Sequence, residues 1–158
     1  MIIQTLKEFC QILACGKRLI AIDYGSKKLG IAISDPGLNM ALPMKEINET
    51  NDQQKIVQIL TIFKTNLVSA IVIGLPINMD GSFSVQTEVV LKFADKLAVK
   101  TNLPIFLQDE RLTTRAADNL LKIGGLKRKE RNARDDSVAA CLILHTVLSY
   151  YNKNKPIL

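Results

Sequence analysis

Several residue patterns that define common protein classes are missing from this chain of 158 residues. Its three cysteines are an odd number without a CxxC pair, which excludes a disulfide framework and a zinc knuckle. No uncharged apolar run reaches about 18 residues, the length that a membrane-spanning helix needs. The sequence also has no internal repeat and no low-complexity segment. We therefore expect a protein of the reducing cytoplasm that does not bind a membrane.

Two kinds of catalytic site are poorly supported. The single histidine, His145, lies in an apolar helical pattern without an evident nucleophile partner, so we interpret it as a packed residue. Residues 74–76 and 80–82 form a glycine-containing loop that matches no phosphate-binding fingerprint such as GxxxxGKS/T. Residues 23–26 are similar to the first phosphate loop of actin-like and Hsp70-like ATPases, but those proteins need two such domains and this chain has room for one.

The composition describes one globular domain with a substantial core. Hydrophobic residues make up 47% of the chain and charged residues 23%, so burial can offset the conformational entropy that folding costs. The 21 Lys and Arg exceed the 15 Asp and Glu, which gives a net charge of +6. This excess suggests an anionic partner without identifying it.

The apolar pattern predicts an α/β fold. Residues 19–22 and 29–33 flank a glycine-containing turn, as in a β-hairpin, and residues 40–47 can add a third strand at an edge of the sheet, where Pro43 is tolerated. Strands and helices then alternate. These further elements are expected over 52–64 (helix), 70–73 (strand), 84–100 (helix), 105–108 (strand), 114–122 (helix) and 136–151 (helix). We predict a mixed five-stranded sheet, antiparallel in its first three strands and then parallel, with helices on both faces.

The N-terminal segment precedes this pattern. Apolar residues from Ile2 to Leu13 recur at helical spacing, which predicts an amphipathic helix that packs on the domain or on a partner and ends at Gly16. We therefore divide the chain into a helical extension over 1–16, a main domain over 17–151 and a C-terminal tail over 152–158.

Acidic residues close several apolar runs. Asp23 ends the first strand, Asp109-Glu110 end the fifth, and Asp135-Asp136 open the final helix. Open sheets bind ligands at the carboxyl ends of their strands, and carboxylates that converge there usually imply a bound cation. Oxygen ligands favour Mg²⁺ or Mn²⁺ over zinc. Simpler interpretations remain open, since Asp135 can cap the helix and Asp109 can pair with Arg111 or Arg115.

Most of the excess positive charge lies just before the final helix. The segment 127–134 carries five basic residues against Glu130, a net +4. Basic side chains beside an acidic metal site suit a phosphodiester substrate, because they neutralise backbone phosphates. A solvated charged loop is the alternative. The predicted nucleic-acid-binding residues here are Lys127, Arg128, Lys129, Arg131 and Arg134, and Lys27 and Lys28 in the first hairpin turn extend the same surface.

Four motifs together resemble those of one family. They are Asp23-Tyr24-Gly25, the segment 74–81 (GLPINMDG), the segment 109–114 (DERLTT) and the segment 135–140 (DDSVAA). In order and spacing, from about residue 17 to residue 151, they resemble the YqgF family, also called RuvX or Holliday-junction-resolvase-like. This resemblance implies a ribonuclease H-like fold and a bacterial cytoplasmic nuclease that matures the 5′ end of the 16S ribosomal RNA precursor.

The resemblance also implies the catalytic residues. Asp23, Glu110 and Asp136 would be the catalytic, metal-binding carboxylates, and Asp136 is chosen over Asp135 because it directly precedes Ser137. Two Mg²⁺ or Mn²⁺ ions about 3.5 to 4 Å apart would hydrolyse the phosphodiester, leaving 3′-hydroxyl and 5′-phosphate ends. Arg111 would help to position the backbone. Motif residues without an assigned role are Asn78, Asp80, Thr113, Thr114 and Asp135.

Two alternatives to an RNA-processing nuclease remain open. A Holliday-junction resolvase would cut four-way DNA junctions and normally acts as a dimer, whereas the sequence is compatible with a monomer or a homodimer. A non-catalytic RNA-binding or ribosome-binding module would keep the fold and the charge but cleave nothing. The retained carboxylates argue against this second alternative.

Overall fold

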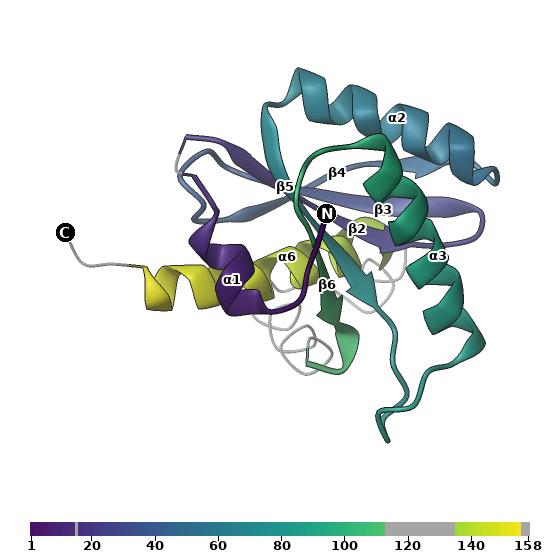
Figure 1. Ribbon diagram of the computed structural model, residues 1–158. Helices are drawn as coiled ribbons and strands as arrows, with labels where there is room; N and C mark the ends of the chain where they lie inside the picture. Colours follow the sequence, from purple (N-terminus) through teal and green to yellow (C-terminus); the bar gives the residue numbers. More distant parts are fainter. Residues whose placement is uncertain (15, 113–134, 156–158) are drawn as a thin grey trace.

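The computed structural model describes residues 1–14, 16–112 and 135–155, with the backbone but not the side chains of Leu112, Asp135 and Asp136 (Figure 1). Its strands form one mixed sheet in the order β1-β6-β5-β2-β3-β4. β2, β3 and β4 are antiparallel neighbours, whereas β5, β6 and β1 continue the sheet parallel to β2. The strands are β1 (Ile2–Ile3), β2 (Arg18–Tyr24), β3 (Lys28–Ser34), β4 (Ala41–Asn48), β5 (Val68–Leu75) and β6 (Ile105–Asp109).

Helices cover both faces of this sheet. α2 and α3 lie on one face, and α6 crosses the other face with α1 beside it (Figure 1). Side-chain caps fix where two of them begin: Asn51 Oδ1 accepts a hydrogen bond from Gln54 N, and Ser84 forms a capping box with Thr87. The helices are α1 (Leu6–Gln11), α2 (Asp52–Thr65), α3 (Val85–Lys100) and α6 (Asp135–Asn154), and a single 3₁₀ turn, η1 (Glu110–Leu112), follows β6.

Alternation along the central strands produces two apolar cores. On β2, Ile20 and Ile22 pack with the α2 and α3 side, whereas Leu19 and Ala21 pack with α6. All four side chains are fully buried, as expected for a strand with helices on both faces. The same alternation continues to the end of each strand, so it decides which face the polar residues at the carboxyl edge occupy.

The expected α/β architecture is confirmed, with one more strand than predicted. Ile2 and Ile3 are a short edge strand, because Ile2 lies opposite Ile105 and Ile3 opposite Phe106 on β6. The N-terminal helix is accordingly shorter than predicted and runs only over Leu6–Gln11. Phe9 of this helix is fully buried and stacks on Phe106 with ring centroids 5.5 Å apart. The N-terminal segment therefore packs on the domain.

Two expectations near the end of the chain have different outcomes. The last helix begins within one residue of its predicted start but continues to Asn154, three residues beyond the predicted end of the domain. The helix predicted over 114–122 lies outside the described residues. Within the described part of the chain, no helix is both long and apolar enough to cross a membrane.

Truncation of Phe9 tests whether the N-terminal segment contributes to the stability of the domain. We expect Phe9→Ala to lower the free energy of unfolding by about 3–5 kcal/mol, because a fully buried aromatic side chain is lost and a cavity remains. Ile12→Ala is the matched control, since Ile12 lies just after the same helix and is 49% exposed. Urea unfolding followed by circular dichroism measures the free energy of unfolding of both variants and of the wild type. If Phe9→Ala were as stable as the wild type and the control, the N-terminal segment would contribute nothing to the stability of the domain.

Candidate active site

Three parallel strands bring the candidate residues to one edge of the sheet. Ile22 of β2 lies opposite Ile73 of β5, which lies opposite Leu107 of β6. The next position along each strand is therefore Asp23, Gly74 and Gln108. Parity places all three on the α6 face, since Ala21, Val72 and Phe106, two residues earlier, belong to the core beneath α6.

Glu110 reaches this face from the turn after β6. A Cβ atom added to Gly74 would lie 2.5 Å from Glu110 Oε1 and 2.5 Å from Ile143 Cδ1 of α6. Glycine at position 74 thus leaves the space that the Glu110 carboxyl group occupies. The Glu110 carboxyl group therefore lies over Gly74, and Asp23 is at the neighbouring position on β2, one strand spacing of about 4.8 Å away.

The electrostatics of Glu110 differ from those of Asp109 beside it. Burial raises the pKa of Glu110, and repulsion from the Asp109 carboxylate raises it further. Asp109 points to the other face, where Arg111 donates to both of its carboxylate oxygens, with Nη2 2.7 Å from Oδ2. This pairing lowers the pKa of Asp109. Within this pair, the Asp109 carboxylate is therefore neutralised by Arg111, whereas the Glu110 carboxyl group is buried in a less polar environment.

α6 begins above the same edge of the sheet. Ser137 Oγ donates a hydrogen bond of 2.8 Å to the carbonyl of Met44 on β4, and Met44 lies opposite Ile31, which lies opposite Ile22. Ser137 is therefore anchored on the row just before Asp23, and the backbone of Asp135 and Asp136 precedes it. Their side chains lie outside the described residues, so the choice between them stays a prediction.

Gln108 is a further candidate for the site that the sequence analysis did not name. Its side chain is only 2% exposed and lies opposite Gly74. Nε2 donates to the Asp109 carbonyl at 3.4 Å, whereas Oε1 is buried and has no hydrogen-bond partner within the described structure. A polar residue at the end of the apolar run 105–107 was the available signal. Gln108 therefore adds an oxygen acceptor on the face that Asp23 and Glu110 share.

The predicted motif residues Asn78 and Asp80 organise the loop after β5. Asn78 Nδ2 donates to Ser82 Oγ at 3.0 Å, and Asp80 Oδ1 accepts hydrogen bonds from the Ser82 amide and hydroxyl at 2.8 and 2.6 Å. These bonds lower the pKa of Asp80, and the nearby Arg111 lowers it further. Arg111 Nη1 also donates to the Met79 carbonyl at 3.4 Å. Arg111 therefore ties the loop to the residue after Glu110.

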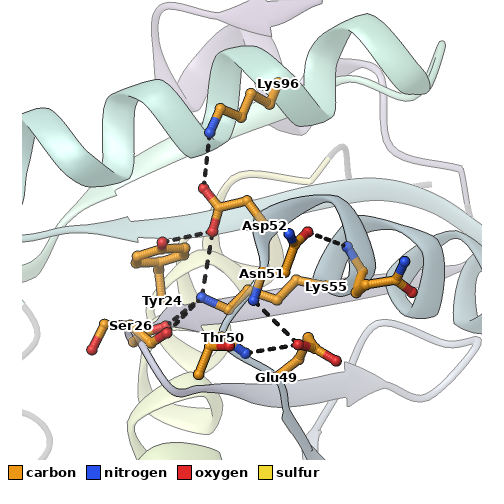
Figure 2. Close-up of polar contacts among 10 residues, drawn as sticks. Tyr24, Ser26, Glu49, Thr50, Asn51, Asp52, Lys55 and Lys96 are labelled. Carbon is orange, nitrogen blue, oxygen red and sulfur yellow. Dashed lines mark hydrogen bonds and ion pairs between the residues drawn. The ribbon is translucent and has the colours of Figure 1, made fainter.

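A buried lysine fixes the turn that follows Asp23. Lys55 of α2 is fully buried, and its Nζ donates to the carbonyls of Gly25 and Ser26 at 2.9 and 3.1 Å and to Asp52 Oδ1 at 3.4 Å (Figure 2). It also lies 4.4 Å from the centroid of the Tyr24 ring. All three ammonium hydrogens thus have acceptors. These contacts join α2 to the end of β2, on the face of the sheet opposite Asp23 and Glu110.

Asp52 is the counter-ion of this cluster. Tyr24 Oη donates to its Oδ1 at 2.8 Å, and Lys96 of α3 donates to its Oδ2 at 3.1 Å (Figure 2). Although burial alone would raise the pKa of Asp52, these hydrogen bonds and the two lysines lower it. Burial, together with Asp52, raises the pKa of Tyr24 to about 12. This cluster could not be predicted from the sequence, because Lys55 resembles any polar residue on the exposed side of a helix.

The predicted basic residues are only partly covered by the structure. Lys27 and Lys28 are exposed at the β2–β3 turn, and Lys28 Nζ lies 3.8 Å from Glu46 Oε2 on β4. Their role in binding nucleic acid, like that of Arg111, stays a prediction. His145 lies along α6 with Ser149 Oγ 3.2 Å from its Nε2. The predicted residues outside the described ranges are Thr113, Thr114, Lys127, Arg128, Lys129, Arg131 and Arg134.

The donor set fits a hard divalent cation. Asp23, Glu110 and the amide of Gln108 offer oxygen atoms, which Mg²⁺ and Mn²⁺ prefer. The raised pKa of Glu110 and the unpartnered Gln108 Oε1 both mark places where a cation, or water bound to it, would compensate a buried oxygen. Among the side chains that the structure describes, no three His, Cys, Asp or Glu residues form a group suited to a metal.

Comparison with known families identifies the relationship. A family model described as "RuvX: Holliday junction resolvase" matches residues 17–150. The chain belongs to the RuvX family. A relative from Rickettsia africae (strain ESF-5), named "Putative pre-16S rRNA nuclease", is 55% identical over 148 residues, which cover 94% of this chain and 96% of the relative. A relative of the same name from Rickettsia felis is 54% identical over 97% of this chain and 99% of its own length.

Solved structures support the fold. Thermus thermophilus RuvC in complex with a Holliday junction substrate has a TM-score of 0.55 and 15% identity, and the match covers 89% of this chain and 99% of that one. The fowlpox virus resolvase in its complex with Holliday junction DNA gives a TM-score of 0.51 at 12% identity, over 88% and 99% of the two chains. The predicted ribonuclease H-like fold is thereby confirmed. With its family membership, this RuvX protein is a nuclease, a hydrolase of phosphodiester bonds.

Substitution of Lys55 tests the buried cluster. We expect Lys55→Met to lower the free energy of unfolding by about 3 kcal/mol. Methionine fills a similar space, but the carbonyls of Gly25 and Ser26 and the Asp52 carboxylate lose their buried cationic donor. Lys96→Met is the matched control at the same carboxylate, and it should cost below about 1 kcal/mol since Lys96 is largely exposed. Chemical unfolding at neutral pH measures the stability of both variants. Equal losses of stability would contradict the conclusion that Lys55 is the buried cation on which this cluster depends.

A methyl group at position 74 tests the space beside Glu110. We expect Gly74→Ala to displace the Glu110 carboxyl group and Ile143, since the added Cβ would lie 2.5 Å from both. Overpacking of this kind costs about 1–3 kcal/mol of stability. Nuclease activity, measured well below the melting temperature, should fall at least about tenfold, the effect of 1.4 kcal/mol. A stable and fully active variant would show that the close approach is unimportant.

Proposed function

We propose that this RuvX protein is a Mg²⁺- or Mn²⁺-dependent nuclease that matures the 5′ end of the 16S ribosomal RNA precursor in the cytoplasm. The observation that supports the site is that the Glu110 carboxyl group lies over the side-chain-free Gly74, beside the strand position of Asp23 at the carboxyl edge of parallel strands. The RNA substrate is proposed from the relatives at 53–55% identity that bear this name.

Each residue at this edge has a separate proposed role. Asp23, Glu110 and Asp136 would hold the two metal ions, and these ions would supply activation of the attacking water and stabilisation of the departing 3′-oxygen. Arg111 keeps Asp109 neutralised, so that Asp109 does not compete for the metal and Glu110 remains the ligand from this pair. Lys55 holds the backbone after Asp23 and limits the directions in which this carboxylate can point.

The products follow from this chemistry. Water attacks the phosphorus and the bond to the 3′-oxygen breaks, which leaves a 3′-hydroxyl on one fragment and a 5′-phosphate on the other. The proposed backbone contacts are the basic residues named from the sequence, among which Lys27 lies in the β2–β3 turn and Lys28 begins β3. Their charge attracts phosphates of RNA and DNA alike.

Cleavage of a four-way DNA junction is the second candidate function, because the description of the matching family names Holliday junction resolution. Symmetric resolution requires two active sites and thus a dimer. A protein that remains monomeric with bound junction would argue against this candidate and leave the RNA candidate untouched.

A cleavage assay with matched variants tests both candidates. The substrates are a 16S precursor RNA and a synthetic four-way DNA junction, each with Mg²⁺, with Mn²⁺ and with chelator. We expect the wild type to cleave the RNA only with metal, and Asp23→Asn, Glu110→Gln and Asp136→Asn each to lose at least about a hundredfold in rate, since one ligand charge is removed. Asp135→Asn is the control for register and should remain active.

Thermal melting in chelator separates a catalytic effect from an unfolded variant. Glu110→Gln should melt no lower than the wild type without metal, because it removes a carboxylate whose pKa is raised by burial. Its ionised form is disfavoured by folding, so the amide relieves a cost at neutral pH. Full metal-dependent activity of Asp23→Asn or Glu110→Gln would overturn the proposed site.

A further inference from the structure

An apolar tip projects beside the active site. This tip is the segment 76–84 between β5 and α3, which extends beyond the edge of the sheet (Figure 1). In it Met79 is 86% exposed and Phe83 55% exposed. The other four phenylalanines of the chain are buried, between 0% and 8% exposed. Met79 and Phe83 are four residues apart in this short loop, and apolar side chains exposed together favour a surface that contacts a partner.

Hydrogen bonds within the loop hold this tip in one shape. The Asn78 amide donates to the Ser82 carbonyl at 3.0 Å, and the Gly81 amide donates to the Asn78 carbonyl at 2.8 Å. Gly81 has φ of 90°, which favours glycine at this tight turn. With the side-chain bonds of Asp80 and Ser82 described above, the loop is ordered before any partner arrives. A surface ordered in advance loses little entropy on binding.

The tip lies next to the residues proposed to hold the metal. Arg111, the residue after Glu110, donates to the carbonyl of Met79, and its Nη1 would lie 3.6 Å from a Cβ on Gly81. Phe83 follows Gly81 by two residues, so their Cα atoms are at most about 7 Å apart. A nucleic acid strand with its phosphate at the carboxylates would therefore pass within reach of Met79 and Phe83.

We infer that Met79 and Phe83 form a platform on which an unpaired base of the substrate strand stacks beside the cleaved phosphodiester. The inference rests on the proposed function, since it places the base relative to that site. Stacking on an aromatic ring contributes about 1–3 kcal/mol per base and suits every base, because each has a π face. Bases inside a duplex are already stacked, so the platform selects single-stranded nucleotides next to the cleavage position.

The chemistry of the surroundings favours a base over an apolar protein surface. Arg111 donates to the Met79 carbonyl of this loop, and at the same edge of the sheet Lys27 is exposed in the β2–β3 turn and Lys28 at the start of β3. Phosphates attract these cations while the base covers the apolar tip. A second copy of this chain, or another protein, is the alternative occupant, and the experiment distinguishes it.

Fluorescence of 2-aminopurine in a short single-stranded RNA tests the platform. The RNA is titrated with protein in chelator, so that binding is measured without cleavage, and the reporter is moved along the strand. We expect quenching at one position with the wild type, loss of this quenching with Phe83→Ala, and its recovery with Phe83→Tyr. Affinity should fall about tenfold in Phe83→Ala, equivalent to 1.4 kcal/mol. Val99→Ala, at an 82% exposed site on α3, is the matched control and should behave as wild type.

An abasic nucleotide at the quenched position supplies the decisive comparison. It should weaken binding to the wild type as much as Phe83→Ala does, and the two changes together should cost no more than either alone. In cleavage assays Phe83→Ala should raise KM and leave kcat within about twofold. Additive losses, or unchanged quenching in Phe83→Ala, would overturn the platform.

The same measurements separate the platform from the proposed function. If the wild type cleaves neither RNA nor junction but quenches at one position through Phe83, the nuclease assignment fails and the platform stands. If sedimentation shows that Phe83→Ala dissociates an oligomer while RNA binding is unchanged, the tip is a contact between copies of this chain, which contradicts the inference.

Discussion

The parallel alignment of β2, β5 and β6 is the constraint on which the rest of the molecule depends. It sends the ends of three strands to the same edge, so that Asp23, Gly74 and the Asp109-Glu110 pair meet although they are far apart in sequence. Antiparallel neighbours would have sent every second strand end to the opposite edge. The N-terminal strand and α1 extend the side of the sheet beside β6 and bury Phe9 against Phe106.

The two faces of the sheet have separate functions at this edge. On the α6 face, glycine at position 74 admits the Glu110 carboxyl group, and burial there raises the pKa of Glu110. On the opposite face, Lys55 and Asp52 hold the backbone that follows Asp23. A buried ion pair seldom adds net stability over an apolar pair of the same shape. Here Lys55 donates to two carbonyls of this turn, and Arg111 in the same way contacts both Asp109 and the Met79 carbonyl of the loop after β5.

Part of the candidate site could be predicted from the sequence, because the ends of strands can be found from apolar runs. Asp23 and Glu110 were identified in this way, with the family resemblance choosing Glu110 over Asp109. The structure is consistent with that choice, since alternation along β6 sends Asp109 to the other face, where Arg111 pairs with it. Gln108 was missed because a single polar residue at the end of a strand has many ordinary explanations. Lys55 was missed because burial of a helical lysine depends on what the helix packs against.

The sequence by itself determined the α/β class and the order of strands and helices after residue 17, and it supplied the candidate carboxylates, because periodicity and motif spacing are local properties of the chain. Tertiary structure decided whether Ile2 and Ile3 belong to a helix or a strand, since two residues are too few for either period to be recognised and only pairing with β6 settles it. It also decided which residues share a face around Gly74 and that Lys55 is buried. These are contacts between distant segments, and no local pattern encodes them.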